Sequence, residues 1–135
     1  MAWNSVASER TQRSLERLER ALARLSEALD EPPDGPLVLD GTIQRFEFVF
    51  ELAWKTMRHC LAEEGTETAT PRETLRAAYA AGIVSDEDGW LALLQARNET
   101  SHTYDDEVGR HVYAAVATSI PLFEDAVAAV AARIG

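Results

Sequence analysis

Residues 43–61 read IQRFEFVFELAWKTMRHCL, and the spacing of the apolar side chains in this stretch predicts an α-helix. The apolar positions recur every three or four residues: Ile43, Phe46, Phe50, Ala53, Met57 and Leu61. Four more apolar residues widen this face beyond a single stripe: Phe48, Val49, Leu52 and Trp54. A helix so apolar is expected to be buried on two sides, as in a bundle or at a subunit interface.

Breaking residues bound this helix on both sides. The segment 30–36, DEPPDGP, is the clearest loop in the chain. Either Asp40 caps the helix, or the helix begins near Pro36 and carries Gly41 inside it. Gly65 is expected to end it, because glycine readily adopts the left-handed conformation that follows many helices.

Leucines three and four residues apart predict a second helix before the loop: Leu15, Leu18, Leu22, Leu25 and Leu29. Arginines repeat the same spacing, about 140° round that helix: Arg10, Arg13, Arg17, Arg20 and Arg24. An arginine row suits a phosphate backbone or an acidic partner. We favour a solvated surface as the simpler interpretation, since Glu9 and Glu16 each stand four residues before an arginine and can pair with it.

Two shorter helices are predicted after Gly65. Thr70-Pro71-Arg72-Glu73 combines a capping box with proline at the first helical position, and the helix that it opens should stop at Gly82. Ser85 precedes three acidic residues, which the helix dipole favours in a first turn. The helix that begins there should fray near Ser101.

The last helix is expected to open either with Thr103 paired to Asp106 or with Asp105 alone. Pro121 interrupts its apolar pattern, so a kink or a break is expected there. No segment shows the period of two that a strand needs, and no internal repeat is visible. The sequence therefore predicts five helices in one all-α domain over residues 1–135, an antiparallel up-and-down four-helix bundle with one short extra helix.

Composition narrows the function of the 135 residues. Their net charge of −10 argues against a passive nucleic-acid coat, because binding to phosphate needs concentrated positive charge, here at most a local basic patch. The single cysteine, Cys60, excludes an internal disulfide. We expect a cytoplasmic protein with no membrane contact, because no stretch approaches the roughly 20 apolar residues of a membrane span and no signal peptide is recognisable.

The segment richest in chemical groups is residues 97–104, RNETSHTY, called the octet below. On one continuous helix Arg97 and His102 would lie about 140° apart, so they converge only if the helix ends between them or a partner chain completes the site. A histidine can take a proton from a ribose 2′-hydroxyl and an arginine can stabilise a phosphorane, which would give metal-independent RNA cleavage. Spacing alone favours the structural alternative, in which Arg97 binds helix-terminal carbonyls while His102 and Thr103 form a turn.

The apolar helix carries the other candidate site, a polar row with one arginine nearby: Glu47, Glu51, Lys55 and Arg45. An i,i+4 Glu–Lys ladder is a simpler account of this row than acid–base catalysis. We expect no metal and no cofactor, because His59, Cys60 and His111 lack the spacing of zinc ligands and no phosphate-binding loop is present. A nucleotidyltransferase catalytic centre is also absent.

Two segments resemble the nucleotidyltransferase substrate-binding protein family. Residues 43–55 look like its signature helix, and Thr70-Pro71-Arg72-Glu73, Ala81-Gly82-Ile83 and the octet follow in the family's order. Members are four-helix up-and-down bundles that dimerise and bind a minimal nucleotidyltransferase encoded nearby. The resemblance covers roughly residues 10 to 130 and implies a homodimer and that partner. On this basis we assign nucleotide or partner binding to Arg45, Glu47, Glu51 and Lys55.

This family is similar to the wider HEPN group, whose R-x4-H-x-Y motif is matched by Arg97, His102 and Tyr104. In HEPN ribonucleases the arginine and histidine of both protomers line one cleft at the dimer interface. The polar residue after the arginine, here Asn98, supports them. In HEPN toxin–antitoxin pairs the nucleotidyltransferase adds AMP to the motif tyrosine, which implies Tyr104, and silences the toxin.

Two functions remain open from the sequence. One is a ribonuclease toxin in which Arg97, Asn98 and His102 are catalytic. The other is a non-catalytic subunit that binds a substrate or nucleotide for its nucleotidyltransferase partner. RNA or a nucleotide is the expected ligand in either case.

Overall fold

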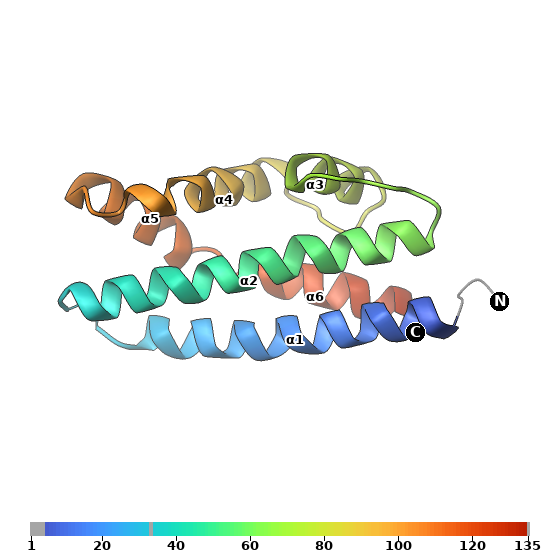
Figure 1. Cartoon of the computed structure of the whole chain (residues 1–135), viewed down its shortest axis with the longest axis horizontal. Coiled ribbons are helices and arrows are strands. Elements are labelled where there is room, and N and C mark those ends of the chain that lie inside the picture. Colours follow the sequence, from blue (N-terminus) through green and yellow to red (C-terminus); the bar gives the residue numbers. More distant parts are fainter. Residues whose placement is uncertain (1–4, 33, 135) are drawn as a thin grey trace.

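The computed structural model describes residues 5–32 and 34–134, which form helices and short connections with no strand among them (Figure 1). The helices are α1 (Ser5–Asp30), α2 (Pro36–Glu63), α3 (Pro71–Ala80), α4 (Glu87–Glu99), the 3₁₀-helix η1 (Thr100–His102), α5 (Asp106–Ala117) and α6 (Ile120–Ile134). The prediction of an all-α fold is confirmed. The described residues hold six α-helices, one more than the sequence predicts.

The two longest helices, α1 and α2, lie antiparallel along the length of the molecule (Figure 1). Helices α3 and α4 run back along α2, and α6 returns beside α1 and α2. The first turn of α1 and the last turn of α6 therefore lie at the same end, whereas α5 lies at the other end (Figure 1).

The core is built around aromatic rings from three helices. The centroids of Trp90 and Phe123 are 5.4 Å apart in an edge-to-face arrangement, and Phe50 lies 6.3 Å from Trp90. Phe46 lies 6.1 Å from Phe50 and 6.2 Å from Phe123. Such pairs add about 1 kcal/mol each to the stabilisation from burial. The prediction that α2 is buried on two sides is confirmed, with one exception: Phe48 is 58% exposed.

Helix α2 begins at Pro36 and carries Gly41 inside it, so Asp40 is not its cap. At its other end Gly65 has a φ of 94°, in the left-handed region that glycine tolerates. The amide of Thr66 donates to the carbonyl of Leu61 at 2.9 Å, and the amide of Gly65 donates to that of Ala62 at 3.1 Å. This hydrogen-bond pattern is the Schellman motif, and it confirms Gly65 as the predicted stop.

Helix α3 begins and ends where the sequence predicts. Thr70 caps α3 by accepting from the amide of Glu73 at 3.2 Å, and Gly82, with a φ of 82°, follows its end. The predicted start of α4 is wrong by one residue. Asp86 and not Ser85 is the cap, because its Oδ1 accepts from the amide of Gly89 at 2.8 Å.

The predicted last helix is two helices. Asp105 alone caps α5, accepting from the amides of Glu107 at 2.9 Å and Val108 at 3.2 Å. The helix is interrupted between Ala117 and Ile120, just before Pro121, and α6 is bent by 44° relative to α5. Proline fits the first turn of α6, where its missing N–H leaves no hydrogen bond unmade. No single described helix is long and apolar enough to cross a bilayer, although α5 and α6 reach that length and composition as a bent pair.

Candidate functional site

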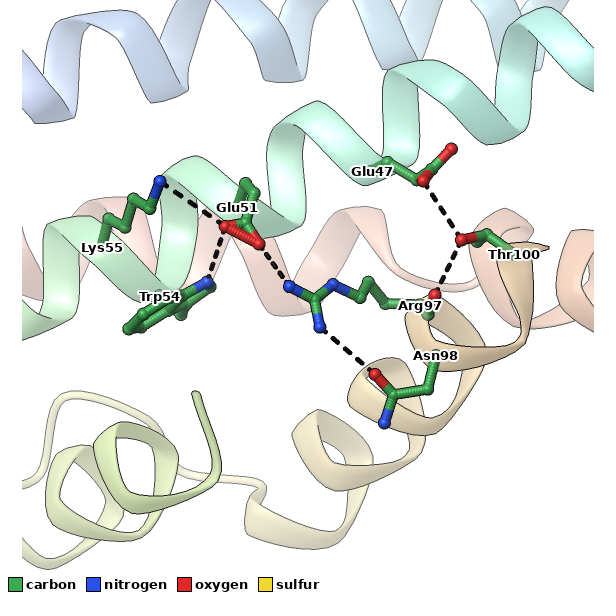
Figure 2. Close-up of polar contacts among 7 residues, drawn as sticks. All are labelled: Glu47, Glu51, Trp54, Lys55, Arg97, Asn98 and Thr100. Carbon is green, nitrogen blue, oxygen red and sulfur yellow. Dashed lines mark hydrogen bonds and ion pairs between the residues drawn. The ribbon is translucent and has the colours of Figure 1, made fainter. Parts of the chain in front are cut away.

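The octet spans the end of α4, all of η1 and the turn before α5. Arg97 lies in the last turn of α4 and points toward α2 (Figure 2). The change from α-helix to 3₁₀-helix at Thr100 then turns the chain, and both His102 and Tyr104 are exposed. The expectation that the helix ends between Arg97 and His102 is confirmed.

Arg97 is held by three contacts and remains 32% exposed. Its Nη2 donates to Oε1 of Glu51 at 2.5 Å, and its Nη1 donates to Oδ1 of Asn98 at 3.2 Å (Figure 2). Its guanidinium carbon also lies 5.9 Å from the ring centroid of Phe50, within range of a cation–π interaction. The side chain is thus fixed in position by α2 and by its own neighbour in α4.

Glu51 is the centre of a charged cluster on α2. Trp54 Nε1 donates to its Oε2 at 3.1 Å, and Lys55 Nζ lies 3.7 Å from the same oxygen (Figure 2). Burial acts to raise the pKa of Glu51. The hydrogen bonds from Arg97 and Trp54, together with the charges of Arg97 and Lys55, outweigh burial and lower the pKa below its usual value. Glu51 therefore carries a full negative charge near neutral pH.

A second bridge joins α2 to the octet one turn away. The hydroxyl of Thr100 lies 3.1 Å from Oε2 of Glu47 and 2.7 Å from the carbonyl oxygen of Arg97 (Figure 2). The two carboxylates are four residues apart on α2, and their partners are three residues apart, Arg97 in the last turn of α4 and Thr100 at the start of η1. Because these spacings match on neighbouring helices, both bridges form at once.

His102 and Tyr104 form the exposed part of the octet. Their ring centroids are 6.1 Å apart with an interplanar angle of 67°, and Tyr104 is 84% exposed. Within the part of the chain that the structure describes, no hydrogen bond or ion pair joins the imidazole of His102 to Arg97. The two groups that RNA cleavage would need are thus not bonded to each other within one chain.

An open hollow of about 360 Å³ lies beside Tyr104. It is lined by Asp40, Ile43, Glu47, Thr100, Ser101, Thr103 and Tyr104. Hydroxyl and carboxylate oxygens predominate in this lining, and such groups can donate or accept hydrogen bonds to a sugar or a base.

The polar row on α2 divides between two sides of that helix. Glu47 and Glu51 meet the octet, and the predicted Glu51–Lys55 pair is present, although Arg97 lies nearer to Glu51. Arg45 points the other way, and its Nη1 donates to the carbonyl oxygen of Arg24 in α1 at 2.7 Å. The four residues assigned to binding thus do not form one site.

The structural alternative for the octet is partly right. His102 and Thr103 do lie in a turn, where the hydroxyl of Thr103 donates to the carbonyl oxygen of Thr100 at 3.1 Å. Arg97, however, directs its guanidinium to Glu51 and Asn98, and Thr100 binds the helix-terminal carbonyl instead.

Three contacts of this site were not anticipated, those made by Phe50, Trp54 and Thr100, although Thr100 itself belongs to the octet. Phe50 and Trp54 were assigned to the core, where they do lie, but they also contact Arg97 and Glu51. The matching spacings of Glu47 with Glu51 and of Arg97 with Thr100 could have indicated the bridges. In residues 5–32 and 34–134, no group of three His, Cys, Asp or Glu side chains could hold a metal ion.

Comparison with known proteins finds a family that matches most of the chain and one similar protein. Residues 13–131 match the family described as nucleotidyltransferase substrate binding protein like. Over 84 residues the chain is 38% identical to a Haemophilus influenzae protein named "Probable ribonuclease HepT", and the match covers 58% of each chain. The matched part is thus little more than half the length of that relative.

Two solved structures share the fold. One is a crystal structure of a Thermus thermophilus protein, with 32% identity and a TM-score of 0.71. The other, from Haemophilus influenzae, is described as revealing the fold of a substrate binding domain of a nucleotidyltransferase, with 28% identity and a TM-score of 0.78. Each comparison covers 87% of this chain and 98% of the other.

Proposed function

Since the chain belongs to the family described as nucleotidyltransferase substrate binding protein like, we propose that it is the helical partner of a minimal nucleotidyltransferase and itself a HEPN-type ribonuclease. The observation that carries this proposal is the arrangement of the octet. Arg97 is fixed by Glu51 and Asn98, whereas His102 and Tyr104 are exposed on the adjoining turn. The relative named as a ribonuclease supports the same activity.

The proposed reaction needs only protein side chains. His102 takes the proton from a ribose 2′-hydroxyl, and the 2′-oxygen attacks the adjacent phosphorus. The bond to the 5′-oxygen breaks, that oxygen receives a proton, and a 2′,3′-cyclic phosphate is left. Arg97 stabilises the negative charge of the phosphorane, and Asn98 keeps the guanidinium in place.

A homodimer would complete this site. Within the described residues no hydrogen bond or ion pair joins the imidazole of His102 to Arg97, and a second protomer facing the octet would add its own arginine and histidine to the site. Two guanidinium and two imidazole side chains would then share one groove. They would also give the local positive charge that a chain of net charge −10 needs to hold RNA.

Tyr104 is the proposed point of control by the nucleotidyltransferase. Its phenol is 84% exposed and lies beside His102, so an enzyme that carries ATP can reach it. The phenol oxygen attacks the α-phosphorus of ATP, its proton is lost and pyrophosphate leaves. The bound AMP would put a negative phosphate and a bulky nucleoside next to the imidazole, and so would block RNA.

One observation favours a second function, a non-catalytic subunit that binds nucleotide or substrate. Glu51 neutralises Arg97 at 2.5 Å in the single chain, which leaves little net charge to attract phosphate. The substrate-binding description of the Haemophilus influenzae structure agrees with this function. Arg45, Glu47, Glu51 and Lys55 would then serve nucleotide or partner binding from two sides of α2.

The decisive experiment is RNA cleavage by the purified chain in the presence of a metal chelator. The wild type is expected to leave 2′,3′-cyclic phosphate ends. His102→Ala and Arg97→Ala should each lower the rate by about 10²- to 10⁴-fold, the range for loss of a general acid–base group or a charge-stabilising donor. Arg72→Ala is the control for Arg97→Ala, because this exposed arginine lies in α3, outside the octet, and should leave the rate unchanged.

The two functions separate on the same samples. Cleavage that does not depend on His102 would overturn the ribonuclease proposal, as would intact RNA with a dimer that is correctly folded. Co-purification with a nucleotidyltransferase, without cleavage, would support the binding subunit. Mass spectrometry after co-expression would test the control step, since AMP is expected on the wild type and not on Tyr104→Phe.

A further inference from the structure

The arginine row of α1 is exposed, and its charges are not neutralised by ion pairs. The row consists of Arg10, Arg13, Arg17, Arg20 and Arg24. None of them lies within 4 Å of a carboxylate in the described residues, so the pairing expected with Glu9 and Glu16 does not form. The row is therefore a solvated surface, as expected, but without the glutamate pairs that were its suggested explanation.

The row follows the seam between α1 and α2. At one end Arg10 lines a small hollow with His59 and Glu63 of α2, and the Glu63 carboxylate lies beyond ion-pair distance of Arg10. At the other end Arg24 lines a hollow of about 330 Å³ with Arg45 and Phe48 of α2. The three arginines between them fall on the same helical face, so the row extends over roughly 20 Å, from about 1.5 Å per residue.

The larger hollow combines an exposed ring with fixed polar groups. Phe46 and Phe50 are fully buried, but Phe48 is 58% exposed on the same helix. The guanidinium of Arg45 is held beside it by the hydrogen bond to the carbonyl oxygen of Arg24. Gln44, Ala21 and Gly41 complete the lining. Small residues leave the hollow open, and the amide of Gln44 adds both a donor and an acceptor.

We propose that the α1–α2 seam binds a single-stranded polynucleotide, with the arginine row on the phosphates and a base stacked on Phe48. A cationic track beside an exposed aromatic ring is how proteins bind unpaired strands without reading sequence. A duplex would satisfy the arginines but would offer no free base to the ring. The chain carries −10 overall, so its attraction for a polyanion has to come from such a local row.

The seam is separate from the octet. Arg45 faces α1, whereas Glu51 faces α4 and Glu47 faces η1 on another side of α2. The seam would therefore hold RNA at a distance from the groups that cleave it. This inference rests on the proposed ribonuclease function only in taking RNA as the natural ligand, and nothing in the seam distinguishes ribose from deoxyribose.

The test measures binding without cleavage. Fluorescence anisotropy follows a labelled oligouridylate of about 12 nucleotides on the full chain carrying His102→Ala, with oligothymidylate and a duplex as further ligands. Arg17→Gln/Arg20→Gln should weaken single-strand binding at least tenfold at about 50 mM salt and lower the slope of log affinity against log salt by about 1.4, from about 0.7 per phosphate contact. Phe48→Leu should weaken binding about tenfold at any salt concentration.

Matched controls come from α3. Arg72→Gln/Arg76→Gln makes the same change in net charge at exposed positions, and Tyr79→Leu removes another exposed ring. Both should bind the single strand as tightly as the chain that carries only His102→Ala.

Equal losses in the α1 and α3 arginine variants, or tighter binding of the duplex, would overturn the proposal. It would also fail if the α1 variant kept its affinity for RNA and lost only a protein partner. If the wild type binds the single strand but does not cleave RNA, the ribonuclease function is refuted and the seam proposal stands.

Discussion

Arg97 and Glu51 meet at 2.5 Å although they stand 46 residues apart in the chain, and their ion pair ties the octet to the most buried helix of the fold. The contact has two consequences. It fixes the guanidinium in one place, and it neutralises part of its charge before any ligand arrives.

Glu51→Gln should lower the free energy of unfolding by about 1 kcal/mol at neutral pH, a value reduced to allow for solvent screening of a group that is 35% exposed. Because the folded protein holds the pKa of Glu51 below 4.5, its ionisation stabilises the fold above that pH. The stabilisation is lost as pH falls through the lowered pKa. Urea unfolding at neutral pH and near pH 3 should therefore show a difference that shrinks in acid.

Glu67→Gln provides the control for this pH dependence, because Glu67 is exposed and forms no ion pair within the described residues. Its effect should be small at both pH values. An undiminished Glu51→Gln effect in acid would mean that packing, and not charge, accounts for the loss.

The bridge between Thr100 and Glu47 should be measurable as a coupling energy. Thr100→Val and Glu47→Gln are each expected to destabilise the chain by about 1 kcal/mol, and the double variant by less than the sum. Urea unfolding of the four proteins gives the coupling directly. Strict additivity would show that the two side chains do not interact in solution.

Replacing each of two glycines by alanine, one inside α2 and one just after it, should change the stability of the chain in opposite directions. Gly41 lies inside the helix with open space where the methyl group of an alanine would lie, so Gly41→Ala should stabilise the chain by about 0.5 to 1 kcal/mol. Gly65 has a φ of 94°, and Gly65→Ala should cost about 1 kcal/mol from backbone strain alone. Thermal unfolding of both variants checks this, and a loss of stability in Gly41→Ala would contradict the position of the α2 start.

Cys60 should be inert in the native protein. Burial, with the charge of Glu64 next in importance, raises the pKa of its thiol from 9.0 to about 12. The thiolate fraction near pH 8 is then on the order of a thousandfold lower than in the unfolded chain, and the thiolate is the reactive form. A chromogenic disulfide reagent should react slowly with the native protein and rapidly in concentrated urea. Equal rates would show that the thiol is accessible.

Local sequence rules predicted most of the fold. Glycine and proline at helix ends act through the conformation of one or two residues, so the stops at Gly65 and Gly82 and the start at Pro71 could be recognised from sequence. The count of helices was wrong because Pro121 is compatible with either a kinked helix or a new one. The 44° bend between α5 and α6 depends on how both helices pack on the rest of the molecule.

The site was predicted less completely than the fold. The octet could be recognised because its polar residues are close together in sequence. Its connection to Glu47 and Glu51 could not be recognised from the sequence, since it depends on two distant segments lying side by side in one particular register. The same limitation applies to Arg45, which the sequence grouped with Glu47 although its side chain points to α1.

The first turn of α1 and the last turn of α6 share one end of the molecule, opposite α5 (Figure 1). Two fluorophores attached near these ends would be held close together in the folded chain and would separate on unfolding. Energy transfer between them would therefore report folding in real time while leaving the octet unlabelled. A circular permutant that joins these ends and opens between α1 and α2 would, for the same reason, preserve every contact around Arg97.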